Sequence, residues 1–450
     1  MSTVYIIVVG AGEVGSYVAE RLSRQGHDIA IVENSARRLR AVAERLDVLT
    51  VLGSGTSPRI MAEAGLDQAD IVVAVTSSDE VNLLASLLAK QAGVDRTVVR
   101  IEHPDLRARD AQPLHRAAGI DLIIDPDEET ADEILELLLY PGASEVTVMG
   151  GGEIMVIGAR IGPDAPIVGR TLGEIGDDYE PEWEFIFGAI SRDGQTIIPR
   201  ADQTIEADDL LRVVCKRRAR RELARLLGLA RDVPNRVTLL GGGRTAEILA
   251  ERLSRRGAAV AIVERDPERA LELAGKLERV LVLEGEITDA DLLLEAEIDA
   301  SDAAIALTGE DHANILACLF AKSVGAGETI AVVHRLELLP LLGDAGVDVA
   351  LSPRTASANA VLRFVRGGVT QVATFLEADA EVLELEVKEG SKADGAKISE
   401  LRLPKDMLVG AVIRDGKARI GRGRSQLRHR DHVVVVTTPG SVDEAKQFFG

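Results

Sequence analysis

Two glycine-rich stretches have the residue types and spacing of a phosphate-binding loop. The first, GAGEVG at residues 10–15, follows the apolar run YIIVV and opens the helical pattern EVGSYVAERLSRQG. In such a loop Gly10 permits the tight turn, Gly12 lets the backbone approach a pyrophosphate, and Gly15 lets helix and strand pack closely. The helix start offers N–H groups and the positive dipole end, so the stretch predicts a nucleotide site. Its remaining predicted residues are Ala11, Glu13 and Val14.

An acidic residue stands at the spacing where a nucleotide ribose is bound. Glu33 ends the apolar run DIAIVE, eighteen residues after Gly15. A carboxylate there accepts hydrogen bonds from both ribose hydroxyls and repels a 2′-phosphate. The pattern therefore predicts NAD, NADH or an adenine nucleotide and disfavours the phosphorylated dinucleotide. The alternative is a tight turn in a sheet that holds no ligand.

The second stretch, GGGRTA at residues 241–246, repeats this pattern with two changes. Ala246 takes the place of the third glycine, which the motif tolerates because that position only needs close packing. Arg244 takes the place of Glu13, where its fork of donors suits a di- or triphosphate, although it could equally face solvent. The two sites could thus prefer different nucleotides, with ATP or ADP possible at one or both. The predicted residues of the second site are Gly241, Gly243, Arg244, Thr245 and Glu264.

Polar residues at other strand ends are further candidates on the same rim. Thr76 and Ser77 follow the apolar run IVVAV, and Thr308 stands at the matching place in the second half of the chain. These side chains could touch ribose or phosphate, or they could cap the helix that follows. The stretch 53–55, GSG, ends the third apolar run where an adenine edge would lie.

The similarity of the two sites extends over the whole chain. AERLSRQG at 19–26 recurs as AERLSRRG at 250–257, and GAISRDGQ at 188–195 recurs as GAVIRDGK at 410–417. VTSSDEVNLLASLLAK at 75–90 recurs as LTGEDHANILACLFAK at 307–322, which pairs Asp79 with Asp311 and Asn82 with Asn314. The chain is therefore one sequence of about 225 residues duplicated, a first repeat and a second repeat.

Within each repeat the pattern predicts two folds in succession. Short apolar runs first alternate with helical stretches, which is typical of a parallel sheet with crossover helices, and short strands with turns follow. The predicted fold class is α/β, with two tandem Rossmann-like doubly wound parallel sheets, each followed by a small α+β module. The Asp-Gly pair in each of SRDGQ and IRDGK predicts a hairpin turn. The predicted domains are residues 1–140, 141–232, 233–366 and 367–450.

Composition excludes several classes of function. A net charge of -21 and only 3% aromatic residues argue against a nucleic-acid partner. No run approaches the roughly 18 apolar residues of a membrane span, and no basic leader precedes the first strand, so we expect a cytoplasmic protein. The two cysteines, Cys215 and Cys318, stand apart among apolar neighbours and predict core packing, with neither a disulfide nor a metal site.

Catalytic groups are missing from the sequence pattern. No tyrosine is followed by a lysine four residues later, so the base of short-chain reductases is absent. The histidines His103, His115, His312 and His334 do not recur at matching places and have no obvious carboxylate partner along the sequence. A small module follows each sheet where a dehydrogenase would carry a substrate domain. We predict a protein that is not an enzyme, with an NAD-dependent oxidoreductase as the alternative.

Together these motifs resemble the TrkA family, the regulatory subunits of Trk-type potassium uptake systems built from two tandem RCK units. The resemblance rests on GAGEVG with Glu33, GGGRTA with Glu264, the helix at 75–90 and the small module after each sheet. It implies a nucleotide-gated homotetramer that lies at the inner face of the cell membrane through a membrane-embedded potassium transporter subunit. Regulation of a different ion transporter is the alternative. Departures from the family pattern are Ala246 and GSGTS at 53–57.

Two helical stretches are candidates for contacts between subunits. Residues 81–90 and 313–322 read VNLLASLLAK and ANILACLFAK, with apolar residues on more than one face. Such a helix can join two subunits or lie buried within its own domain. Either interpretation fits the sequence.

Overall fold

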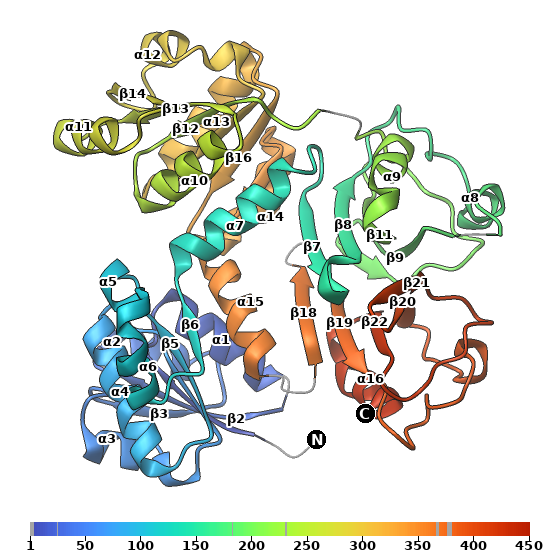
Figure 1. The fold of residues 1–450 in the computed structure, drawn as a ribbon, viewed down its shortest axis with the longest axis horizontal. Helices are drawn as coiled ribbons and strands as arrows, with labels where there is room; N and C mark the ends of the chain where they lie inside the picture. Colours follow the sequence, from blue (N-terminus) through green and yellow to red (C-terminus); the bar gives the residue numbers. More distant parts are fainter. Residues whose placement is uncertain (1–3, 25, 182, 230–231, 366–368, 376–379) are drawn as a thin grey trace. The chain divides into compact units, whose positions relative to one another are not determined.

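The computed structural model describes residues 4–24, 26–181, 183–229, 232–365, 369–375 and 380–450 (Figure 1). The chain divides into two compact units. The first unit comprises Met1–Thr130 and Ser352–Arg366, and the second comprises Ala131–Leu351 and Gly367–Gly450. The division does not follow the two repeats, because each unit contains a segment from the other repeat.

The first unit is built on a six-stranded parallel sheet with the order β3-β2-β1-β4-β5-β6. Its strands are β1 Tyr5–Val9, β2 Asp28–Glu33, β3 Leu49–Leu52, β4 Ile71–Ala74, β5 Arg96–Arg100 and β6 Leu122–Ile124. Its helices include α1 Glu13–Arg24, α2 Ala36–Ala43, α3 Pro58–Glu63, α4 Asp79–Ala92, α5 Pro104–Arg107 and α6 Gln112–Ala118. Because successive side chains of a strand point to opposite faces, Ile6 and Val8 enter one core, and Ile7 and Val9 enter another. Helices cover both faces of the central strands, which is why β1 and β4 are apolar and almost entirely buried.

A helix of the second repeat completes the first unit. Helix α15, Pro353–Val365, packs beside α1, and its Val361 and Leu362 are buried in the same core as β1 (Figure 1). Arg96 fixes the end of this helix, since its guanidinium donates to the carbonyls of Phe364 and Val365 at 3.1 and 3.3 Å. A cation at a helix C-terminus also complements the helix dipole.

The second unit contains the matching parallel sheet, with the order β14-β13-β12-β15-β16-β17. Its strands are β12 Arg236–Leu240, β13 Ala259–Glu264, β14 Val280–Glu284, β15 Ala303–Ala306, β16 Glu328–Val332 and β17 Val349–Leu351. Its helices are α10 Arg244–Arg255, α11 Pro267–Lys276, α12 Ala290–Glu295, α13 Asp311–Val324 and α14 Leu339–Ala345. Helix α7, Pro126–Leu138, comes from the first repeat, yet its Ala131, Ile134 and Leu135 are buried in the core of this second sheet.

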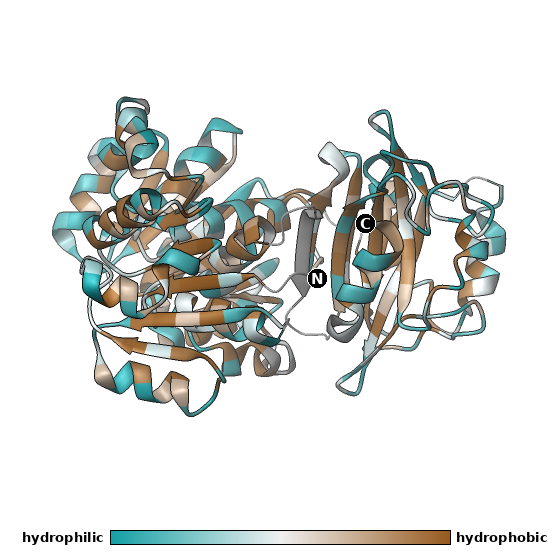
Figure 2. Ribbon diagram, turned by 90° about the horizontal axis from the view of Figure 1, so that it is seen from below, coloured by the Kyte–Doolittle hydropathy of each residue, from teal (hydrophilic) through white to brown (hydrophobic). Residues whose placement is uncertain are grey.

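The second unit also holds two small antiparallel sheets, with the orders β10-β9-β11-β8-β7 and β18-β19-β22-β20-β21. The first consists of β7 Glu145–Met149, β8 Ile154–Arg160, β9 Phe185–Arg192, β10 Gln195–Ile197 and β11 Leu210–Lys216, with α8 Leu172–Asp178 and α9 Arg220–Leu226. The second consists of β18 Val369–Phe375, β19 Ala380–Glu386, β20 Met407–Arg414, β21 Lys417–Ile420 and β22 His432–Thr437, with α16 Val442–Phe449. Leaving β18 aside, Figure 2 shows apolar residues along the longer of these strands and mostly polar residues in the loops. Buried residues of both sheets share one core.

The predicted hairpin turns are confirmed. Asp193 and Gly194 join β9 to β10 with φ of 51° and 73°, and Asp415 and Gly416 join β20 to β21 with φ of 51° and 71°. Two positive φ values define the type I′ turn, whose twist matches that of the flanking strands.

The two cysteines are confirmed as core residues. Cys215 and Cys318 are fully buried and free, and burial raises the pKa of each thiol to about 12. In the part of the chain that the structure describes, no helix is long and apolar enough to cross a membrane.

Candidate functional site

In each parallel sheet the strand order reverses beside the first strand of the repeat. In the first unit, β1 lies between β2 and β4, so the chain leaves β1 toward one side and returns to β4 on the other. Ligands of open α/β sheets bind in the crevice at the carboxyl ends of such strands. The glycine loop that follows β1 and the loop that follows β4 meet there, since a Cβ added to Gly10 would lie 3.0 Å from the methyl group of Thr76.

The first glycine loop makes a tight turn and packs closely against the start of α1. Gly10 has a φ of +103°, and its N–H donates to the carbonyl of Val32 at 2.8 Å. A Cβ at Gly15 would lie 1.9 Å from the carbonyl oxygen of Gly10, so only glycine lets α1 start this close to the strand. A Cβ at Gly12 would meet nothing within 4 Å among the described residues, so the space beside this backbone is open. Val14 packs in the core, whereas Glu13 is exposed.

Glu33 holds the first loop in place. Its carboxylate is buried at 5% exposure and accepts the N–H of Ala11 at 2.7 Å and the N–H of Ser35 at 2.8 Å. Each carboxylate oxygen therefore already has a backbone donor, and a ribose would share these oxygens through their remaining lone pairs. The sequence predicts an acidic group at the ribose position, but it does not reveal this second role as a brace of the glycine loop.

The second loop repeats the same bonds. Gly241 has a φ of +109°, and the N–H of Gly242 donates to Glu264 at 2.6 Å. The other oxygen of Glu264 accepts the N–H of Asp266 at 2.8 Å. A Cβ at Gly243 would meet nothing within 4 Å, and no side chain caps the start of α10 there.

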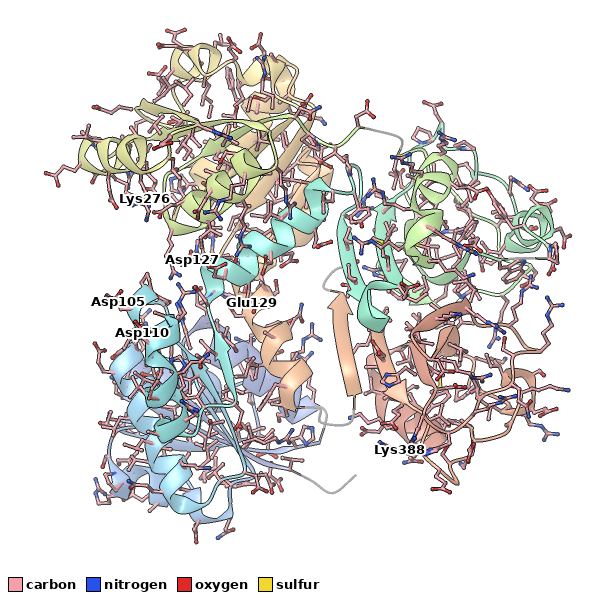
Figure 3. All side chains as sticks on the ribbon, viewed as in Figure 1. Asp105, Asp110, Asp127, Glu129, Lys276 and Lys388 are labelled. Carbon is pink, nitrogen blue, oxygen red and sulfur yellow. The ribbon has the colours of Figure 1, made fainter. Side chains whose placement is uncertain are left out.

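Charged residues surround the first turn of α10. Arg244 and Thr245 are half-buried at its first two positions, and Ala246 is fully buried beneath them. Arg269 donates through Nε to the carbonyl of Gly242 at 2.9 Å and also pairs with Glu247. Lys276, labelled in Figure 3, pairs with the same carboxylate. Burial by itself raises the pKa of Glu247, but the hydrogen bonds from Lys276 and Arg269 hold it below its usual range.

Thr76 and Thr308 each bond to a buried asparagine. Asn82 is fully buried. Its Oδ1 accepts hydrogen bonds from the N–H of Thr76 at 2.9 Å and from the Thr76 hydroxyl at 2.7 Å. Its Nδ2 donates to the carbonyls of Thr76 and Arg100, both at 3.0 Å. Asn314 makes the same bonds with Thr308 and with the carbonyl of Val332. Neither threonine caps the helix, because Ser78 supplies the cap of α4 and Glu310 stands at the cap position of α13. Ser77 is exposed.

Asp79 and Asp311 also position a neighbouring loop. Asp79 accepts the N–H groups of Glu102 and His103 after β5. Asp311 accepts those of His334 and Arg335, and His334 Nδ1 lies 3.1 Å from its carboxylate, so this histidine has an acidic partner that sequence spacing did not show. Burial raises the pKa of Asp311, but the backbone N–H groups of His334 and Arg335 together with the His334 side chain hold the pKa below its usual range.

The other three histidines have separate local environments. His103 caps α5, His115 Nε2 lies 2.5 Å from the carbonyl of Leu106, and the side chain of His312 is exposed. None of the three is bonded to the glycine loops by any contact between the residues that the structure describes.

The loop after β3 lies against the end of β1. Gly53 has a φ of +156° and donates its N–H to the carbonyl of Glu33 at 2.9 Å. A Cβ at Gly55 would lie 2.3 Å from the side chain of Val9, and Ser54 bonds to the hydroxyl of Thr56 at 2.8 Å. A Cβ at Gly53 would lie 2.7 Å from the side chain of Ile60, so close packing against a neighbouring side chain explains both glycines.

The structure adds one residue that sequence reasoning missed. Arg354, near the start of α15, forms an ion pair with Glu13 at the start of α1. The two residues are 341 positions apart in the chain, and no local pattern connects them. Among the described residues, no cluster of three or more His, Cys, Asp or Glu side chains could hold a metal ion.

Family models match most of the chain in the same alternating order. The TrkA-N domain model matches residues 6–134 and 237–353, and the TrkA-C domain model matches residues 156–228 and 382–450. The chain is 35% identical to Trk system potassium uptake protein TrkA homolog 2 of Methanosarcina mazei, with 98% of this chain and 99% of the relative covered. It is 34% identical to Trk system potassium uptake protein TrkA of Halomonas elongata, with 96% and 95% covered.

The chain belongs to the TrkA family.

Solved structures share the fold of this TrkA-family chain. The GsuK channel aligns with a TM-score of 0.63 and 18% identity, covering 99% of this chain and 78% of the channel chain. The GsuK channel bound to NAD aligns with a TM-score of 0.61 at the same identity and coverage. The predicted fold class and the family resemblance are therefore confirmed.

Proposed function

We propose that this protein is the nucleotide-binding regulatory subunit of a membrane-embedded Trk-type potassium transporter. It binds NAD or NADH, ADP or ATP without converting them, and it uses the binding energy to change the conformation of a homotetramer on the cytoplasmic face of the membrane. The observation that carries this proposal is the pair of glycine loops, each braced by one glutamate and open at its middle glycine. Curated relatives at 32–35% identity are named as potassium uptake proteins, and one GsuK structure contains NAD and another ADP.

The proposed site residues lie around these loops. In the first site they are Gly10, Ala11, Gly12, Glu13, Val14, Gly15, Glu33 and Thr76, and in the second Gly241, Gly243, Arg244, Thr245, Glu264 and Thr308. Phosphate meets the helix start, and ribose meets the glutamate.

Contacts lead from the first loop to a helix with an exposed apolar face. A Cβ added to Gly10 would lie 3.0 Å from the methyl group of Thr76, and Thr76 is bonded to Asn82 within α4. Leu84 on the same helix is 39% exposed, and Leu316 on the matching α13 is 58% exposed. In the proposed tetramer these leucines face other subunits, so a ligand that shifts the loop after β4 also shifts a subunit contact. Only a difference in affinity between two conformations can move the equilibrium, and about 1.4 kcal/mol per site changes it tenfold.

Matched substitutions at the middle glycines test each site separately. Gly12→Asp and Gly243→Asp place a carboxylate where the phosphate would lie; neither position has a positive φ, and each added Cβ meets open space. The fold should therefore tolerate both. We expect calorimetric titration of the full chain with NADH, ADP and ATP to show each variant losing one site and the double variant losing both, while NADH absorbance stays constant. These variants test ligand binding more selectively than replacement of Glu33 or Glu264, because loss of either glutamate would also remove the hydrogen bonds that hold the glycine loop.

The transport role is tested in cells that lack this gene, at limiting external potassium. We expect the native protein to restore potassium uptake and the double variant to leave it misregulated, although the variant accumulates to the same level and melts at the same temperature. Unchanged uptake after deletion, in cells without a parallel system, would refute the potassium role. Steady consumption of NADH with a small carbonyl compound would support the oxidoreductase alternative instead.

A further inference from the structure

The mouth of the first glycine loop carries an arginine from the second repeat. Arg354 pairs through Nη2 with Glu13, the first residue of α1. The Arg354 side chain is 20% exposed, and the Glu13 side chain is 50% exposed. Because phosphate is expected at the start of α1, this guanidinium lies within one side-chain length of the proposed phosphate position.

The same guanidinium has a donor that the protein does not use. Arg354 Nε is buried, and it has no hydrogen-bond partner among the described residues. Leaving a buried charged donor without an acceptor is costly, and such groups in native structures call for an explanation. Phosphate oxygens are the acceptors that best match the fork of an arginine, since two of them can be bound at once.

We propose that Arg354 binds the terminal phosphate of a nucleoside di- or triphosphate in the first site, in competition with Glu13. A terminal phosphate has free oxygens and about two negative charges. In NADH both phosphates are diesters with one charge each, and the nicotinamide ribose extends from the end where the free phosphate would be. Arg354 therefore selects ADP or ATP over NADH at this site. The inference rests on the proposed nucleotide-binding function and names the residue that gives it specificity.

The proposal makes the two partners of one ion pair act in opposite directions. Arg354 attracts the phosphate, whereas Glu13 repels it and occupies the guanidinium. If the pair only supported the fold, loss of either partner would break the same bond and would shift affinity in the same direction. The sign of the two effects thus separates ligand recognition from a structural role.

The experiment uses the full chain with Gly243→Asp, so that only the first site can bind. Titrations with ATP, ADP and NADH are compared for this parent and for Arg354→Gln and Glu13→Gln introduced into it. We expect Arg354→Gln to weaken the affinity for ATP and ADP by about tenfold or more, as for a lost charge-assisted hydrogen bond. The affinity for NADH should change by less than about threefold. Glu13→Gln should leave ATP affinity unchanged or make it tighter.

A double variant guards against a simple folding defect. Glu13→Gln with Arg354→Gln leaves no unpaired charge, so a structural role predicts that it recovers the ATP affinity lost in Arg354→Gln. The proposal instead predicts that it binds ATP about tenfold or more weakly than Glu13→Gln alone. Parallel weakening in the two single variants, no effect of Arg354→Gln, or equal loss of ATP and NADH would overturn the role of Arg354. A parent chain that binds none of the three nucleotides would instead refute the first nucleotide site itself.

Discussion

Replacing Asn82 with leucine should destabilise the first unit more than any change at the exposed residues nearby. Leucine fills a similar volume, but it removes the amide that bonds to the N–H and carbonyl of Thr76 and to the carbonyl of Arg100. The hydroxyl of Thr76 keeps a second partner, the carbonyl of Ser78 at 3.2 Å. Three backbone groups of the partly buried Thr76 and Arg100 therefore lose the partner that the fully buried Asn82 supplies.

The expected cost follows from these three groups. Each unsatisfied buried group costs about 1–3 kcal/mol. Because the loop can relax in part, we expect the lower half of the summed cost, a decrease of about 3–5 kcal/mol in the free energy of unfolding. Hydrogen exchange measures this locally. Asn82→Leu should lower the protection of amides in β4, β5 and α4, and Asn314→Leu should do the same in β15, β16 and α13.

Two comparisons make the result decisive. Ser77→Ala changes an exposed neighbour and should cost less than about 0.5 kcal/mol. Asn82→Asp keeps the acceptor for Thr76 but places a second acceptor against two carbonyl oxygens. The loss of folding free energy should therefore grow as the pH rises above the pKa of the introduced carboxyl, and it should shrink in acid. If Asn82→Leu lost no more protection than Ser77→Ala, the asparagine would not be what holds the loop after β4.

Three further changes follow from the same geometry. Gly15→Ala places a methyl group 1.9 Å from the carbonyl oxygen of Gly10 and should cost about 2–3 kcal/mol in chemical denaturation; a wild-type midpoint would contradict the close approach. Leu316→Glu should reduce the mass of the assembly in analytical ultracentrifugation, whereas Leu271→Glu, at a leucine on α11 that is 76% exposed, should not; equal masses for the two variants would remove α13 as a subunit contact. Burial raises the pKa of Asp125 to about 6, and the Arg107 guanidinium opposes this rise only in part. The protonated carboxyl therefore stabilises the folded first unit at low pH. This stabilisation is lost as the pH rises from about 4 through 6. Asp125→Asn should abolish this fall, about 1–2 kcal/mol after allowance for solvent screening, in the hydrogen exchange of β6; an unchanged pH profile would show that another group titrates.

The strands and turns were predictable because their causes are local. A central parallel strand such as β1 is covered on both faces, so it appears in the sequence as an uninterrupted apolar run, YIIVV. The Asp-Gly pairs at 193–194 and 415–416 reveal their turns because a type I′ hairpin needs two positive φ values in succession. Duplication strengthened every such inference, since the same pattern had to explain two stretches.

The roles of Glu33 and Asn82 were only partly predictable. Spacing places a carboxylate near the ribose position, but its bonds to Ala11 and Ser35 depend on how two loops bend toward each other. The pairing of Asn82 with Asn314 is visible in the repeat, yet its purpose depends on β4 and β5 lying side by side. In both cases the missing information is the direction of backbone groups in loops, which periodicity does not encode.

The position of α15 could not be predicted from local pattern at all. Sequence order assigns this helix to the second sheet, whereas its apolar residues are buried against α1 and β1 of the first. Any apolar face of suitable shape can cover a sheet, so hydrophobic patterning specifies that a helix is buried but not which sheet buries it. The ion pair between Arg354 and Glu13 depends on that choice and was therefore invisible in the sequence.

Comparison of the two repeats shows where the two sites have diverged. The proposed ribose end is the same in both, because Glu33 and Glu264 make matching bonds to the glycine loop and to the residue two positions further on. The proposed phosphate end differs in the residue at the helix start, since Glu13, which is paired with Arg354, opens α1 and Arg244 opens α10. Two sites that bound different nucleosides would differ around the ribose and the base. A difference in charge beside the phosphates instead changes whether a site prefers a ligand with more or with fewer phosphate charges. The two sites are therefore expected to share a nucleoside and to differ in how strongly they favour a triphosphate, which would let one protein respond to two nucleotides at once.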